Sequence, residues 1–139
     1  RAKSRWNMHV EVVTNIIPGY NDSDVEIGRL ATWIATHLGK RTPWHVTRFV
    51  PHLDLSDVET TPVDTLDMAR KIGLDVGLLY VYTGNVPGHP GENTYCPKCG
   101  RVVIGRFHFS VFAYNIVDGK CKYCGQKIAG YWEHSENRM

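Results

Sequence analysis

Two short segments, Cys96-Pro-Lys-Cys-Gly100 and Cys121-Lys-Tyr-Cys-Gly125, decide how the last third of this chain folds. In each segment two residues separate a pair of cysteines, so both thiolates can reach one ion. The glycine that follows permits the turn that directs backbone N–H groups at sulfur. Twenty-one residues lie between the pairs, close to the usual span between the knuckles of a zinc ribbon. The sequence therefore predicts one closed, structural Zn²⁺ site formed by Cys96, Cys99, Cys121 and Cys124.

The alternatives for these cysteines, the only four in the chain, are a disulfide pair or a redox-active Cys-x-x-Cys. Two glycine-flanked knuckles, in a chain that shows no secretory leader, disfavour both alternatives. No apolar run approaches the roughly 20 residues that a membrane span needs. We therefore expect a cytoplasmic protein with no membrane partner, in a compartment where thiols stay reduced and available to metal.

The charges are unevenly divided. Residues 1–94 hold nine Lys/Arg and eleven Asp/Glu, whereas residues 95–139 hold seven and three. A basic ribbon suggests nucleic acid. However, four thiolates bring four negative charges and the metal only two positive ones, so much of the basic excess offsets the metal site itself. Nucleic acid is therefore a weak expectation as a partner.

The first 85 residues show an alternation of strands and helices. Runs rich in β-branched residues at 9–17, 45–50 and 77–83 predict three strands. Between them, Ser23 and Glu26 form a capping box for a helix that ends at Gly39, and Thr61 is placed to cap a second helix that starts at Pro62. Such strand–helix–strand units make parallel sheets.

The predicted organisation is a half of a partial (β/α) barrel at 1–85, a Gly/Pro-rich linker at 86–92, a zinc ribbon at 93–133 and a tail at 134–139. Parallel sheets are normally covered on both faces, and two helices cover only one. In addition, the chain opens at Arg1 and runs almost at once into a strand. We therefore expect the first unit to lack partner strands.

Ligands of parallel α/β folds bind at the carboxyl ends of the strands. Asn21 and Asp22 there are explained by a turn and a helix cap. Arg48 could serve either in ligand binding or as a surface ion-pair partner. A lone loop histidine such as His52 is more often solvated than catalytic. The polar residues at these ends are Asn15, Asn21, Asp22, Arg48, His52 and Asn85.

Five segments in this order resemble radical SAM enzymes related to pyruvate formate-lyase activating enzyme, and most closely the AmmeMemoRadiSam system subgroup. They are Val10-Glu-Val-Val-Thr-Asn-Ile-Ile-Pro-Gly-Tyr-Asn-Asp22, Trp44-His-Val-Thr-Arg-Phe-Val-Pro51, Thr61-Pro-Val-Asp-Thr-Leu66, Gly77-Leu-Leu-Tyr-Val-Tyr-Thr-Gly-Asn85, and Asn93-Thr-Tyr-Cys-Pro-Lys-Cys-Gly100 with its second knuckle and Gly130-Tyr-Trp132. The resemblance covers almost the whole chain.

The resemblance implies a partial (β/α) barrel that binds a [4Fe–4S] cluster and S-adenosylmethionine and generates a 5′-deoxyadenosyl radical. The Cys-x-x-x-Cys-x-x-Cys motif that holds the cluster is absent from these 139 residues, as is the methionine-binding segment. By resemblance, Val13, Asn15, Arg48, Val50 and His52 border the adenosine.

The chain therefore resembles the C-terminal half of such an enzyme, inactive alone, whose partners are the missing half-barrel or cluster-binding polypeptide and a protein substrate. The alternative is a free-standing zinc-ribbon module that binds a protein or nucleic acid.

Overall fold

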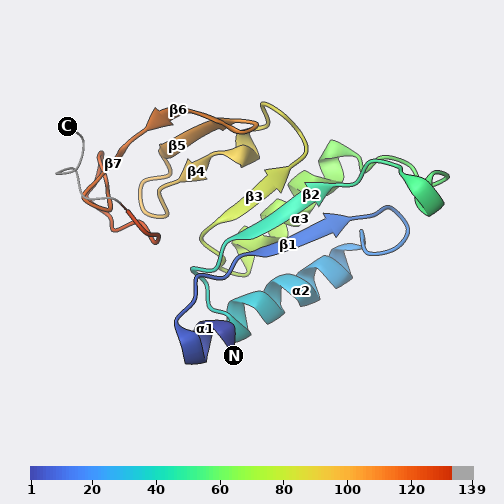
Figure 1. Cartoon of the computed structure of the whole chain (residues 1–139), viewed down its shortest axis with the longest axis horizontal. Coiled ribbons are helices and arrows are strands. Elements are labelled where there is room, and N and C mark those ends of the chain that lie inside the picture. The colour runs from blue at the N-terminus through green and yellow to red at the C-terminus, as the bar shows by residue number, and fades with distance from the viewer. Residues whose placement is uncertain (133–139) are drawn as a thin grey trace.

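The structure is a computed structural model that describes residues 1–132. Its centre is a parallel sheet of three strands, β1 (Val12–Ile16), β2 (Trp44–Arg48) and β3 (Val81–Gly84), in the order β1-β2-β3. Figure 1 shows these strands pointing the same way, with the helices on one side and the C-terminal strands on the other. The expected mixed α/β fold with three parallel strands is confirmed. The expected tail at 134–139 lies outside the described residues.

The connections between the strands are helical, as predicted. Helix α2 (Asp24–His37) begins where the Ser23 hydroxyl accepts a hydrogen bond from the Glu26 N–H and donates one to the Glu26 carboxylate, which is a capping box. Gly39 follows the helix with φ +92°, a conformation that favours glycine. The sequence therefore identified both ends of this helix.

Helix α3 (Val63–Asp75) starts in a way that the sequence did not predict, because Pro62 and not Thr61 is its N-cap residue. The buried Thr61 hydroxyl donates to the Ile16 carbonyl at 2.6 Å and accepts from the Phe49 N–H at 2.9 Å. Thr61 therefore joins β1 to the segment after β2, a tertiary role that a local cap pattern cannot reveal.

The strands are shorter than expected. Helix α1 (Ala2–Trp6) precedes β1, so the chain does not run directly into a strand, and residues 9–11 lie outside β1. Gly77 has φ +96° and its N–H donates to the Leu74 carbonyl, so the chain is still turning out of α3 where the third strand was predicted to begin.

One face of the sheet carries the core. Ile16, Trp44, Val46 and Val81 are buried on this face and pack with apolar side chains of α2 and α3. The Trp44 indole N–H donates to Thr14 at 2.9 Å, so the largest buried side chain has its polar group paired. Both long helices therefore cover a single face, as the helix count predicted.

The opposite face, here called the open face, presents the alternate residues of each strand. The strand register places Val13, His45 and Tyr82 in one row across the sheet and Asn15, Thr47 and Gly84 in the next.

A short 3₁₀ helix, η1 (Leu53–Leu55), lies between β2 and α3. The C-terminal part begins with η2 (Pro90–Glu92) and forms two small sheets from β4 (Thr94–Tyr95), β5 (Val102–Phe107), β6 (Ser110–Tyr114), β7 (Ile116–Val117) and β8 (Lys120–Cys121). Strands β4, β5 and β6 are antiparallel, as are β7 and β8.

This part of the chain is attached to the open face along β3. Tyr80 and Tyr82 pack in one apolar cluster with ribbon residues such as Val103 and Ile128. The segment between the two parts is tied down by His89, whose Nδ1 accepts from the Gly91 N–H at 3.0 Å and whose Nε2 lies 3.1 Å from Asp67 on α3. None of the helices in residues 1–132 has the length and apolar character needed to cross a membrane.

Candidate metal centre and adjoining cleft

The four cysteine sulfurs meet at one point. Cys96 Sγ lies 3.6 Å from Cys124 Sγ, and Cys99 Sγ lies 3.8 Å from Cys121 Sγ. All four sulfurs are within 4.8 Å of one another. A tetrahedral ion with Zn–S bonds of about 2.3 Å separates its sulfurs by about 3.8 Å. The residues therefore fit a single four-coordinate metal ion, and the predicted four-cysteine site is confirmed as a site that could hold a metal.

The two knuckles repeat one backbone pattern. The Gly100 N–H donates to the Cys96 carbonyl at 2.9 Å, and the Gly125 N–H donates to the Cys121 carbonyl at 2.8 Å. The glycines have φ +70° and +72°. An L side chain rarely adopts this conformation, so glycine closes each turn without strain. The local sequence alone therefore shapes each half of the site.

Without a metal ion, the negative charge of one thiolate disfavours ionisation of the neighbouring thiols. Burial raises the pKa of Cys96, but backbone N–H groups of Cys99 and Lys98 and the neighbouring thiols outweigh it and bring the pKa to about 7. For Cys124 a backbone hydrogen bond from Gln126 lowers the pKa, but burial and the other three sulfurs raise it to about 11. Four crowded sulfurs cannot all ionise unaided, so the site favours a bound cation.

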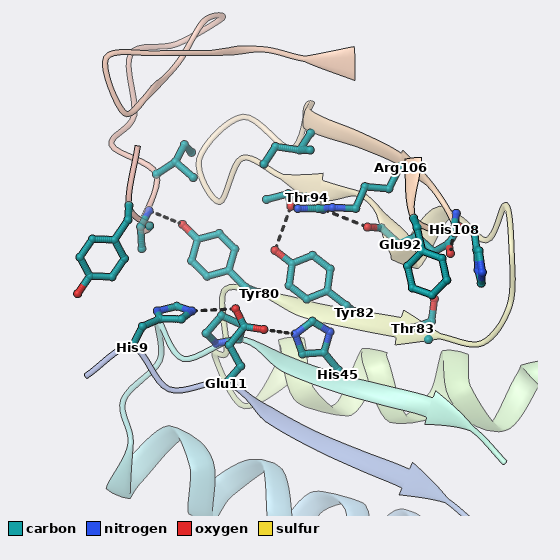
Figure 2. Close-up of a pocket in the computed structure, with 18 of the residues that line it drawn as sticks. His9, Glu11, His45, Tyr80, Tyr82, Thr83, Glu92, Thr94, Arg106 and His108 are labelled. Carbon is teal, nitrogen blue, oxygen red and sulfur yellow. Dashed lines mark hydrogen bonds and ion pairs between the residues drawn. The ribbon is translucent and has the colours of Figure 1, made fainter. Parts of the chain in front are cut away.

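Beside the ribbon lies a cleft of about 640 Å³, within the usual range for small-molecule sites. Figure 2 shows its floor on the parallel sheet and its roof on the ribbon strands. Four polar side chains line the cleft: Glu11, His45 and Tyr82 on the sheet side, and Arg106 on the ribbon side.

A carboxylate held between two imidazoles marks one end of the cleft. His9 Nε2 lies 2.8 Å from one Glu11 oxygen, and His45 Nε2 lies 2.7 Å from the other. Burial raises the pKa of Glu11, but the hydrogen bonds and charges of the two histidines outweigh it and leave the pKa below its ordinary value. An ionised carboxylate only accepts hydrogen bonds, so Nε2 of both rings carries a proton.

The other end is built around Tyr82. Its ring stacks on His45 with centroids 5.0 Å apart, and the Arg106 guanidinium lies 5.6 Å from the ring centroid on the ribbon side. The Tyr82 hydroxyl is 3.0 Å from Thr94 Oγ1, which also accepts from Arg106 at 2.7 Å. Burial raises the pKa of Tyr82, so its phenol stays neutral at physiological pH.

The residues expected to border a nucleotide do not all lie at the carboxyl ends of the strands, because Val13 is the second residue of β1 and pairs with His45 near the start of β2. Val13 and Asn15 are exposed on the open face of β1, and Val50 and His52 follow the carboxyl end of β2, also exposed. Within residues 1–132 no side-chain hydrogen bond joins any of these four to another. Their role in binding stays a prediction.

Arg48 is occupied elsewhere. Its Nε donates to the Thr61 carbonyl at 2.9 Å, and its own carbonyl accepts from Asn85 at 3.1 Å. These bonds hold the end of β2 to the segments before α3 and after β3. This structural role accounts for Arg48 without a bound ligand.

Sequence reasoning did not identify the cleft. Its polar groups come from positions 11, 45, 82 and 106, so no local motif contains them. The one available signal was the spacing of His9 and Glu11, which places two polar side chains on one face of an extended segment.

The geometry defines a parallel α/β unit that carries a four-cysteine metal-site ribbon. The uncharacterized protein MJ0808 of Methanocaldococcus jannaschii is 48% identical to this chain over 130 residues, which is 92% of this chain and 39% of the relative. The chain therefore spans about two fifths of the length of the relative that it matches. No protein-family model matches the chain. No solved structure matches it either.

Proposed function

We propose that this chain is the C-terminal part of a radical SAM enzyme related to pyruvate formate-lyase activating enzyme, with a zinc ribbon as its structural end. The observation that carries the proposal is the sheet. Its three parallel strands follow one another in sequence order, and both crossover helices lie on one face. A segment cut from a (β/α) barrel has this arrangement, with the open face as the inner wall.

In this proposal the zinc ion and the cluster belong to two different parts of such a protein. All four cysteines of the chain belong to the ribbon, where sulfurs within 4.8 Å of one another leave room for a single ion. A [4Fe–4S] cluster, which supplies reductive cleavage of S-adenosylmethionine, would therefore have its ligands in another part of a longer protein. Residues of this chain would contribute the adenosine side of the pocket.

In this proposal Val13 covers one face of the adenine, and the carboxamide of Asn15 hydrogen-bonds its edge. His52 and Val50 close the pocket from the loop after β2. Strand ends suit this task because their free backbone groups can also bind the base. The Zn²⁺ site fixes the ribbon and takes no part in the chemistry.

The test uses the product of the whole gene. The reading frame upstream of the Arg1 codon should encode a Cys-x-x-x-Cys-x-x-Cys motif. The full product, purified without oxygen, should contain cluster iron and sulfide in addition to zinc, and should release 5′-deoxyadenosine from S-adenosylmethionine on reduction. The present chain alone should bind S-adenosylmethionine only at about millimolar concentration or weaker, since half a pocket supplies half the contacts.

Two histidine variants of the full product provide the matched comparison. His52→Ala should raise the KM for S-adenosylmethionine several-fold, whereas His37→Ala, an exposed histidine on α2, should leave it unchanged. A stop codon directly upstream of Arg1, or micromolar binding of S-adenosylmethionine by the chain alone, would overturn the proposal.

A second candidate is a zinc-ribbon module that binds a protein partner. It is favoured by the β5–β6 hairpin, where Phe107, Phe109 and Phe112 are exposed in a stretch, residues 107–117, that contains no Asp, Glu, Lys or Arg. This candidate is preferred if the upstream reading frame is closed.

A further inference from the structure

Arg106 is the one arginine that lines the cleft, and among the described residues its guanidinium has no acidic side chain as an ion-pair partner. Its NH1 donates to Thr94 Oγ1 and, at 3.2 Å, to the Glu92 carbonyl. In the part of the chain that the structure describes, no carboxylate oxygen lies within 4.0 Å of its guanidinium. A half-buried cation without a counter-ion has lost solvent without gaining a charged partner, so the site favours an anionic ligand.

The nearby acidic side chain does not serve as that partner. The Glu92 carboxylate accepts from the backbone N–H of Gly88 at 2.8 Å and from that of His108 at 3.2 Å. These bonds fix Glu92 against the β5–β6 turn, and Figure 2 shows Arg106 and His108 on the ribbon side of the cleft, above Tyr82 and Thr83.

The lining limits the charge of the ligand. Besides its histidines, the lining holds one arginine, Arg106, and two carboxylates, Glu11 and Glu92. A dianion such as a phosphate monoester would meet one cation and two carboxylates, whereas a carboxylate needs only the bidentate pairing that a guanidinium offers. The lining therefore favours a monoanion.

Aromatic side chains determine the rest of the ligand. Tyr82 and His45 form a stacked pair on the floor, and Phe109 stands at the rim with 92% of its surface exposed. The only ring that lies against it is that of its neighbour His108, with centroids 3.9 Å apart, so among the described residues most of the Phe109 ring remains uncovered. It suits a flat apolar group that enters the cleft.

We propose that this cleft is a binding site for a small aromatic or otherwise flat monocarboxylate, whose carboxylate pairs with Arg106 and whose ring lies against Phe109 at the rim. Glu11 holds the His45 ring, and through it the stacked Tyr82 ring, in the orientation that receives the ligand. The site uses only residues of this chain, so it does not depend on the adenosine pocket proposed above.

The experiment uses the zinc-loaded chain and fluorine NMR with three probes: 4-fluorobenzoate, its neutral analogue 4-fluorobenzamide and the dianionic 4-fluorophenyl phosphate. The benzoate should bind at least about tenfold more tightly than either other probe. Equal affinity for the benzamide, or a preference for the phosphate, would overturn the proposal.

Two arginine variants make the matched pair. Arg106→Gln should weaken benzoate binding about tenfold. Arg101→Gln, which removes a guanidinium that lies 4.8 Å from the Tyr123 ring outside the cleft, should change it less than twofold. Equal effects of the two variants would contradict the assignment.

Two further measurements keep the test decisive. If Arg106→Gln does not fold, Arg106→Lys takes its place as the variant, because it keeps the positive charge. In the unmodified chain, bound benzoate should shift the amide signals of Tyr82 and His45. Shifts confined to other residues would overturn the site. A chain that ends at Trp132 should bind benzoate as the full chain does. Binding by the shortened chain with none by the full chain would overturn the proposal.

Discussion

The Tyr80 hydroxyl accepts a 3.1 Å hydrogen bond from the backbone N–H of Ala129. Tyr80 directly precedes β3, and Ala129 follows the second knuckle, so this bond connects the parallel sheet to the far end of the metal-binding ribbon. The Tyr80 side chain is 5% exposed and belongs to the ribbon's apolar cluster. We therefore expect folding of the ribbon around metal to be coupled to the sheet.

Tyr80→Phe should lower the free energy of unfolding of the zinc-loaded protein by about 0.5–1.5 kcal/mol, because it removes the hydrogen-bond partner of the partly buried Ala129 N–H. Urea unfolding followed by circular dichroism measures the change. Tyr131→Phe, at a position 76% exposed, is the control and should have little effect. Equal losses in the two variants would contradict the coupling.

Gly73→Ala should destabilise the sheet–helix packing by about 1–3 kcal/mol. A Cβ at Gly73 would lie 2.9 Å from two ring atoms of the buried Trp44 and 3.0 Å from Val81. The matched variant is Gly28→Ala in α2, where the nearest atom would be 3.9 Å away. There alanine should stabilise the helix by up to about 1 kcal/mol. Thermal unfolding of both variants checks the opposite signs.

Zinc affinity should fall as the pH is lowered. In the metal-free site Cys124, with a pKa of about 11, is protonated at pH 7 and must release its proton on binding. This release alone makes the affinity fall about tenfold per pH unit. Below the Cys96 pKa of about 7 a further proton competes, and this alone steepens the dependence by up to about another tenfold per unit.

Competition with a chromophoric chelator at pH 6, 7 and 8 measures this dependence, and an affinity that is constant over that range would contradict it. Elemental analysis should find about one zinc per chain, and Cys99→Ser should lower that content because a hydroxyl replaces an anionic sulfur. Iron at the same stoichiometry would show that the site holds a different metal.

The free edge of β1 should promote self-association. Within the described residues β1 pairs only with β2, and the strand Val12–Ile16 contains no charged side chain. Unpaired strand edges recruit further strands. Light scattering should show association that increases with concentration, and Val13→Lys should reduce it. Val25→Lys on α2, at a similarly exposed valine, is the control. A monomer at high concentration would contradict this prediction.

Sequence patterns predicted the features that neighbouring residues determine. The Ser23–Glu26 capping box, the positive φ of Gly39 and the two knuckles each depend on residues within a few positions of one another. The alternation of strands with connections of more than twenty residues similarly required parallel pairing.

The features that depend on distant residues escaped prediction. Thr61 has the sequence of a helix cap, but its hydroxyl is used by Ile16 and Phe49, 45 and 12 positions away. The cleft likewise joins Glu11 to His45 across a strand pair and Arg106 to Tyr82 across two sheets. Only the register and the docking of the ribbon bring these side chains together.

Exposure differs among the four cysteines in a way that bears on the kinetics of metal exchange. Cys96 and Cys121 are buried, Cys124 is partly buried and Cys99 is exposed. An incoming chelator or thiol therefore reaches the ion most easily from the Cys99 side, and that bond is the first to be replaced. The lifetime of the bound ion is then set by the rate at which Cys99 detaches and rebinds, while the buried thiolates retain the ion until a second ligand has arrived.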